Sequence, residues 1–248
     1  MTVSLGFPWL IAIGFVAQMI DGCIGMGYGI FSSTILATLG LPPAITSATV
    51  HSAEFVTAGV SGVSHAWFQN IEREIFLSLL VPGVLGGAVG ATVLAHVPVD
   101  VVRPFVWFYL LITSLVVLSR VILNRKPIQL KAQWPALGAI AGFLDAVAGG
   151  GWGTLVTSTL MARGVPSRYA IGTANAVVFF VALTVSITLW AQLRQVYFDI
   201  VLALLLGGAA AAPLAAYVTR HVPHRAASVA VGLIVFFLGV NGLFRTLT

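Results

Sequence analysis

Two glycine-rich segments carry the residues of this 248-residue sequence that are best suited to binding chemistry. They read DGCIGMGYG at 21–29 and DAVAGGGWG at 145–153, and each opens with an aspartate. A helix that starts inside such a segment presents N–H groups without an intrahelical acceptor, and its dipole is positive at that end. Glycine also lets a ligand approach the backbone closely. Two such helix starts could therefore bind an anion without an arginine.

The candidate substrate-binding residues are these segments and the polar residues that follow each of them. In the first half of the chain they are Gly25, Met26, Gly27, Tyr28, Gly29, Thr49 and His51. In the second half they are Gly149, Gly150, Gly151, Trp152, Gly153, Thr173 and Asn175. Alternatively, the glycines only permit tight turns, and the two aromatic residues fill space. Because the two segments match each other, we favour a ligand path.

The aspartates that open the two segments, Asp21 and Asp145, have two possible roles. They could accept hydrogen bonds from the first N–H groups of the following helix and so cap it. They could instead carry protons. We favour capping, because ionised carboxylates in the path would repel an anion.

His51 and Glu54 form a second candidate site on a helix predicted over 43–66. With Ser47, Ser61 and His65 they follow helical spacing and share one face. Ionisable residues near the middle of a membrane helix are costly, and they usually face the bundle interior or a water-filled cavity. We predict that Glu54, with His51, carries a coupling proton. The alternative is a structural hydrogen-bonded pair.

Other chemistries lack the residues that they need. Cys23 is the only cysteine, which excludes a disulfide scaffold and a cysteine-rich metal site. His221 and His224 have the spacing of metal ligands, but they lie in a basic loop without a nearby carboxylate. The sequence shows neither a nucleophile–base set nor a cofactor motif. We therefore expect no enzyme activity, no metal and no cofactor.

The composition is that of a polytopic membrane protein. Hydrophobic residues make up 59% of the chain, charged residues make up only 8%, and the mean hydropathy is +1.04. This is too little charge to cover a water-facing surface and too much hydrophobicity for disorder. The 12 Lys and Arg residues are scattered over loops, which favours membrane topology over nucleic-acid binding. The first 20 residues lack a basic region, so we expect a membrane segment and not a leader.

Charged residues delimit the predicted membrane spans. Besides 43–66, suitable apolar stretches lie within 74–96, 103–120, 168–194, 199–220 and 225–245. Two further stretches, 7–40 and 133–164, are too long for one helix across a core of about 30 Å and too short for two. Each contains one glycine-rich segment, so we predict half-helices of about 14 residues on either side of a break.

The chain repeats itself. A shift of 124 residues places Asp21 on Asp145 and the first glycine-rich segment on the second. We predict a first membrane repeat over 1–123, a basic linker over 124–132 and a second membrane repeat over 133–248. If each break re-enters the membrane, nine Lys and Arg residues lie on the linker side and three on the other. If each break crosses, the division is seven to five, so the positive-inside rule favours re-entry.

The expected fold is an all-α polytopic membrane protein with two inverted repeats. Each repeat is a broken or re-entrant helical hairpin followed by three transmembrane helices. The linker would lie in the cytoplasm and both termini outside. The hairpins would enter from opposite faces and meet near the midplane. Small-residue faces such as Gly83–Gly87 would permit close helix packing, and they make a homo-oligomer possible.

The sequence resembles the sulfite exporter TauE/SafE family of bacterial membrane permeases over nearly its whole length. The segments that carry the resemblance are DGCIGMGYG at 21–29, SATVHSAEF at 47–55, DAVAGGGWG at 145–153 and IGTANAVVFF at 171–180. The resemblance implies movement of sulfite, or of a small sulfonate such as sulfoacetate, across the cytoplasmic membrane. Members of the family often carry an acidic residue where this chain has Val178, so no symmetric pair of carboxylates is implied here.

We therefore expect a secondary transporter in the inner, or cytoplasmic, membrane. It would export sulfite, or a related sulfur oxyanion or organosulfonate, by alternating access around the two breaks. Its partners would be the small anion and the lipid bilayer. A passive anion channel on the same scaffold is the main alternative. An intramembrane enzyme using His51, Glu54 and Asp21, or a structural subunit, is less favoured.

Overall fold

The computed structural model describes residues 6–123, 133–193, 196–218 and 224–247. This part of the chain is helical and contains no strand, which confirms the predicted all-α class. The predicted linker and His221 lie outside the described residues. The helices are α1 (Phe7–Ile24), α2 (Tyr28–Thr38), α3 (Pro43–Trp67), α4 (Arg73–His96), α5 (Val99–Leu123), α6 (Trp134–Ala148), α7 (Trp152–Ala162), α8 (Ser167–Gln192), α9 (Phe198–Val218) and α10 (His224–Leu247).

Several of these helices are suited to a membrane. Among the described residues, three stretches are long and apolar enough to cross one: Arg73–His96, Val99–Val116 and Arg168–Gln192. Shorter apolar helices cover Phe7–Gly22, Trp134–Ala148, Phe198–Ala212 and Gly232–Phe244. On α4, Leu77, Val81, Leu85 and Val89 recur every four residues, and more than half of each is exposed. Such a continuous apolar face fits lipid better than water, in agreement with a membrane location.

Both predicted breaks are present, and their backbone conformations match. Gly25 and Gly149 end α1 and α6 in the left-handed region, with φ angles of 71° and 75°. Gly27 and Gly151 precede α2 and α7 with φ angles of 134° and 139°. Side chains other than hydrogen strain such angles, so these glycines allow one helix to stop and the next to start. The arms are unequal: α1 and α6 have 18 and 15 residues, and α2 and α7 have 11 each.

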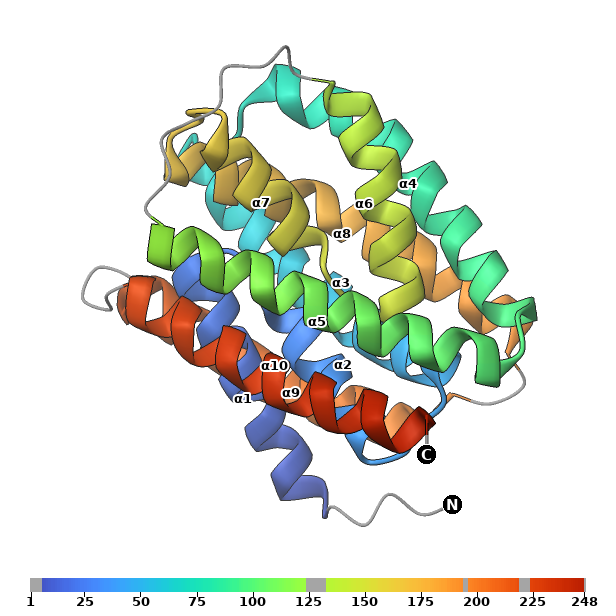
Figure 1. The fold of residues 1–248 in the computed structure, drawn as a ribbon. Coiled ribbons are helices and arrows are strands. Elements are labelled where there is room, and N and C mark those ends of the chain that lie inside the picture. The colour runs from blue at the N-terminus through green and yellow to red at the C-terminus, as the bar shows by residue number, and fades with distance from the viewer. Residues whose placement is uncertain (1–5, 124–132, 194–195, 219–223, 248) are drawn as a thin grey trace.

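Helices from one half of the chain pack against helices from the other. The main cross-half pairs are α1 with α9, α6 with α4, α3 with α8, and α5 with α10. Figure 1 shows α4 beside α6 at the upper right and α5 beside α10 across the front of the molecule. Glycine permits this approach, since a Cβ at Gly86 would collide with the backbone of Ala139, and one at Gly207 with that of Ile11. Both halves therefore build the interior in which the breaks lie.

Candidate functional site

The two glycine-rich breaks lie in direct contact with each other. A Cβ added at Gly29 would meet the backbone of Gly150, and one added at Gly150 would meet that of Gly29. Gly153 faces Gly25 and Met26 in the same way. Most of the residues in both breaks are buried. Segments 124 residues apart in the sequence thus form one site, and their glycines make the approach possible.

Hydrogen bonds connect each break to the opposite hairpin. The Ser33 hydroxyl on α2 donates to the carbonyl oxygen of Gly149. The Thr157 hydroxyl on α7 donates to the carbonyl oxygen of Gly25, 3.0 Å away. Ser33 and Thr157 coincide under the shift of 124 residues, so the two bonds are equivalent in the two halves. Each bond satisfies a carbonyl at the end of a first arm, where helices leave carbonyls unpaired.

Each aspartate contacts the first N–H group of the second arm that follows it. The Trp152 N–H donates to Asp145 Oδ1 at 2.7 Å, and the Tyr28 N–H is 3.4 Å from Asp21 Oδ1. These are the capping contacts that we favoured from the sequence. The first-half contact is longer than an ordinary N–H···O bond, so the helix start at Tyr28 is less firmly capped than the one at Trp152.

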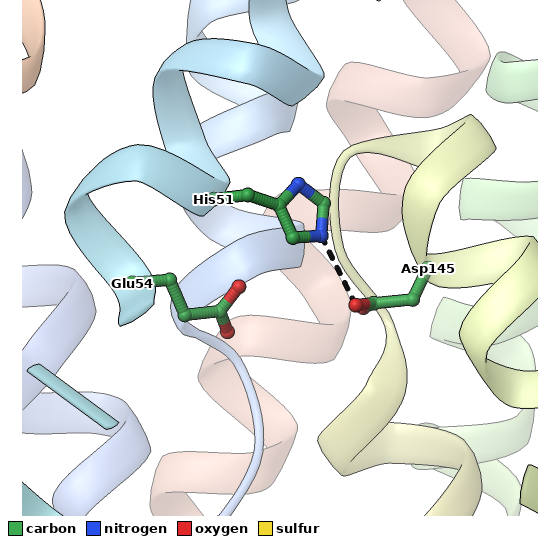
Figure 2. A group of neighbouring side chains, drawn as sticks. All are labelled: His51, Glu54 and Asp145. Carbon is green, nitrogen blue, oxygen red and sulfur yellow. Dashed lines mark hydrogen bonds and ion pairs between the residues drawn. The ribbon is translucent and has the colours of Figure 1, made fainter. Parts of the chain in front are cut away.

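His51 connects the two halves through Asp145 (Figure 2). Its Nε2 lies 3.0 Å from Asp145 Oδ2, and its Nδ1 lies 2.8 Å from the Ser47 carbonyl oxygen. Both side chains are completely buried. Because a carbonyl only accepts, Nδ1 carries a hydrogen, and His51 and Asp145 share one further proton. The partner of His51 Nε2 is therefore a residue 94 positions away and not Glu54, its neighbour on the same helix face.

Glu54 extends its carboxylate toward this pair without joining it (Figure 2). Its Oε2 is buried and has no hydrogen-bond partner among the described residues. One donor atom each from His51, Glu54 and Asp145 lies within 4.8 Å of the others, a spacing that could hold a cation. Asp21 also interacts with Glu54 electrostatically. Our expectation that the protein holds no metal stays a prediction.

The other predicted site residues lie around the breaks with various partners. Trp152 is buried, and its indole N–H donates to the Ala174 carbonyl oxygen at 3.0 Å. The Thr49 hydroxyl donates to Ile45 O within α3, and the Thr173 hydroxyl accepts from the Glu72 N–H. Asn175 is buried, and the Met26 sulfur accepts from the Ser158 hydroxyl at 3.8 Å. That all these residues contact substrate stays a prediction.

The sequence reasoning missed two polar residues next to the breaks. Tyr109 on α5 places its hydroxyl against Gly151, and Ser32 lies on α2 just after the first break. With Tyr28 and Glu54 they carry the buried side-chain oxygens that lack a partner in the described part of the chain. Buried polar atoms are normally paired, so this grouping marks the site. Tyr109 stands in an apolar helix outside the repeated segments, and its only sequence signal is a phenol among apolar side chains.

Comparisons with known proteins agree with this picture. Residues 10–242 match the family model described as sulfite exporter TauE/SafE. A curated relative, the "Probable membrane transporter protein YtnM" of Bacillus subtilis (strain 168), is 36% identical over 246 residues. The match covers 94% of this chain and 81% of the relative. No solved structure gives a significant match.

Proposed function

Since the chain belongs to the sulfite exporter TauE/SafE family, we propose that it exports sulfite, or a related sulfur oxyanion or organosulfonate, across the cytoplasmic membrane. Its membership of the family and its similarity to a probable membrane transporter support the function of a membrane transporter. The substrate, the direction and the mechanism are the proposed part.

The contact between the two breaks is the observation that carries this proposal. It brings the N-terminal ends of α2 and α7 into one buried region. The first-turn N–H groups of both helices lack intrahelical acceptors, and both dipoles are positive there. The Asp145 charge is balanced by His51, at 3.0 Å. The region can therefore stabilise a small anion with backbone donors, as half-helix ends do in other transporters.

The two repeats are proposed to be inverted, with the linker 124–132 in the cytoplasm. The packing is compatible with this arrangement, because α1 lies on α9 while its counterpart α6 lies on α4, and α9 and α4 are themselves counterparts. A two-fold relation between the halves would exchange these pairs. An anion held between the hairpins would be exposed alternately to either side as one repeat rocks against the other.

Glu54 is the proposed carrier of the coupling proton. Its Oε2 has no partner among the described residues, and the titratable groups around it are His51 on its own helix, Asp21 on α1, Tyr28 on α2 and Asp145 on α6. Within the cluster of His51, Glu54 and Asp145, the Asp145 carboxylate is already paired with His51. Glu54 is therefore the carboxylate of this cluster that has no hydrogen-bonded counter-charge within the described chain. Protonation removes the charge of Glu54 while the anion occupies the site.

Efflux from liposomes containing the purified protein tests the function. We expect saturable efflux of sulfite that depends on a pH gradient, with sulfate, sulfoacetate and chloride measured in parallel. Efflux of sulfoacetate alone would support the transport function and replace sulfite as the proposed substrate. A current that rises linearly with voltage and does not saturate would indicate the passive channel. Absence of any anion flux in folded protein would overturn the proposal.

The variant Glu54→Gln tests the coupling. Glutamine keeps the shape of the side chain but cannot exchange a proton, so we predict the same sulfite flux with and without the pH gradient. Sulfite binding, measured by calorimetry, should change much less than the pH response. Glu74→Gln is the matched control, because Glu74 lies in the first turn of α4. An undiminished pH response in Glu54→Gln would contradict the proton-carrier role.

A further inference from the structure

Tyr109 is a buried phenol that belongs to neither repeated break. It lies on α5 and is 8% exposed. In this part of the chain the repeat shifts by 125 residues, as the match of 96–98 with 221–223 shows, so the corresponding residue in the second half is Ile234. A Cβ on Gly151 would collide with its hydroxyl oxygen, so the phenol contacts the residue that immediately precedes α7. Tyr109, from the first half of the chain, therefore places a hydroxyl group at the start of α7, in the second half.

The hydroxyl of Tyr109 has no hydrogen-bond partner among the described residues. The Thr113 hydroxyl acts on the phenol as a hydrogen-bonding neighbour, but it donates its own hydrogen to the Tyr109 carbonyl oxygen at 2.8 Å, and its distance and angle to the phenol do not make a hydrogen bond. Asp145 acts on the phenol electrostatically, yet one of its oxygens accepts from Trp152 and the other pairs with His51. A buried hydroxyl is rarely left unpaired. The O–H of Tyr109 is therefore a donor available to a bound molecule.

Two kinds of donor converge at this point. The Trp152 N–H is bonded to Asp145, so the 11-residue helix α7 presents the N–H groups that follow it in the first turn and the positive end of its dipole, and Tyr109 adds an O–H. Beside them lies a cavity of about 300 Å³ between α5, α6 and α7, whose lining is almost entirely apolar and includes the exposed side chains Phe105, Phe108 and Ile112. The donors at the start of α7, and not this apolar cavity, are what suit an oxyanion.

We propose that Tyr109 is a substrate-binding residue whose hydroxyl donates to an oxygen of the transported anion at the start of α7. The inference rests on the proposed function, and it makes the second half-site differ from the first. At the first break the helix start is held only by the long contact between Asp21 and the Tyr28 N–H. At the second break, Asp145 occupies the first N–H group of α7, and the Tyr109 hydroxyl supplies an additional donor for the anion.

Tyr109→Phe is the decisive variant, because it removes one oxygen and keeps the ring. A hydrogen bond to a charged ligand corresponds to about a ten- to hundredfold change in affinity. We therefore expect the half-saturating concentration of sulfite in liposome efflux to rise about tenfold or more, with a smaller change in maximal rate. Tyr197→Phe, just before α9, is the matched control. Thr113→Val tests whether Thr113 is the partner, and we expect it to behave as wild type.

Thermal unfolding in detergent separates binding from a structural role. Since the Tyr109 hydroxyl has no partner among the described residues, Tyr109→Phe should unfold at the wild-type temperature without ligand. Sulfite should raise the unfolding temperature of the wild type and raise that of the variant much less. A hydroxyl with a purely structural role would instead lower the unfolding temperature in the absence of sulfite.

The two measurements distinguish this inference from the proposed function. Wild-type efflux with an unchanged half-saturating concentration in Tyr109→Phe would overturn the role of Tyr109 and leave the transporter intact. Absence of wild-type efflux, with sulfite still stabilising the wild type more than the variant, would support Tyr109 and overturn transport. Absence of both efflux and stabilisation would overturn both.

Discussion

At the scale of single residues, the three buried groups His51, Asp145 and Glu54 have unequal structural roles. His51 and Asp145 form a pair with no exposure to solvent, whereas Glu54 Oε2 makes no hydrogen bond within the described chain. Removing one partner of a buried charge pair costs about 3–5 kcal/mol, because the other charge is left unbalanced. The pair should therefore support the fold, and Glu54 should be free to serve transport.

This difference predicts an order of stability among three conservative variants. His51→Gln leaves the Asp145 carboxylate without its counter-charge, so we expect its unfolding temperature to fall by roughly 10 °C. Asp145→Asn should fall less, since asparagine still accepts from the Trp152 N–H and His51 can lose a proton. Glu54→Gln should match the wild type. A thermal unfolding series in one detergent measures all three, and equal losses for Glu54→Gln and His51→Gln would contradict the assignment.

Sequence reasoning located these residues but did not give the partner of His51 Nε2. Helical spacing places His51 and Glu54 on one face, which the sequence alone reveals. The hydrogen bond of His51 to Asp145 depends on how α3 packs against α6, and no local pattern encodes the contact of two helices 94 residues apart. Tyr109 was missed for the same reason, because only its contact with Gly151 in the folded chain identifies it as a candidate site residue.

At the scale of helices, the glycines at the breaks fix both the turns and the contact between hairpins. Their positions could be predicted because positive φ angles need glycine, and Gly25 and Gly149 adopt them at matched places. The lengths of the arms could not, because α1 runs to 18 residues where about 14 were expected. Where α1 begins depends on how it packs along α9, and helix propensity alone does not give that boundary.

Gly150→Ala tests the contact between the breaks. Gly150 has a φ angle of 149°, and an added Cβ would collide with the backbone of Gly29. We predict that the hairpins are pushed apart and sulfite efflux is lost, with a lower unfolding temperature. Gly6→Ala is the control, because Gly6 has an ordinary φ of −64° and an added Cβ would make only a van der Waals contact with Pro8. Normal efflux by Gly150→Ala would show that the breaks need not touch.

At the scale of the whole molecule, the arrangement in the membrane follows from whether the breaks re-enter. Re-entry and crossing assign different sides to the segment between α7 and α8, and therefore to Arg168 at the start of α8. Both arrangements, re-entry and crossing, place Arg73 on the linker side of the membrane and Arg103 on the opposite side. Packing of α1 on α9 and of α6 on α4 accords with inverted halves but does not by itself orient them in a bilayer. A chemical label that reaches only one side of the membrane can establish this orientation.

Single cysteines in a Cys23→Ser background give that label a target, since Cys23 is the only native cysteine. In intact cells, a membrane-impermeant thiol reagent should modify Arg103→Cys and leave Arg73→Cys unmodified until the cells are opened. Re-entrant hairpins predict that Arg168→Cys behaves like Arg73→Cys, because positive charge is retained on the cytoplasmic side. Labelling of Arg168→Cys in intact cells would mean that the breaks cross the membrane. The hairpins would then no longer enter from opposite faces. Entry from opposite faces would no longer explain why the helix starts at Tyr28 and Trp152 lie close together.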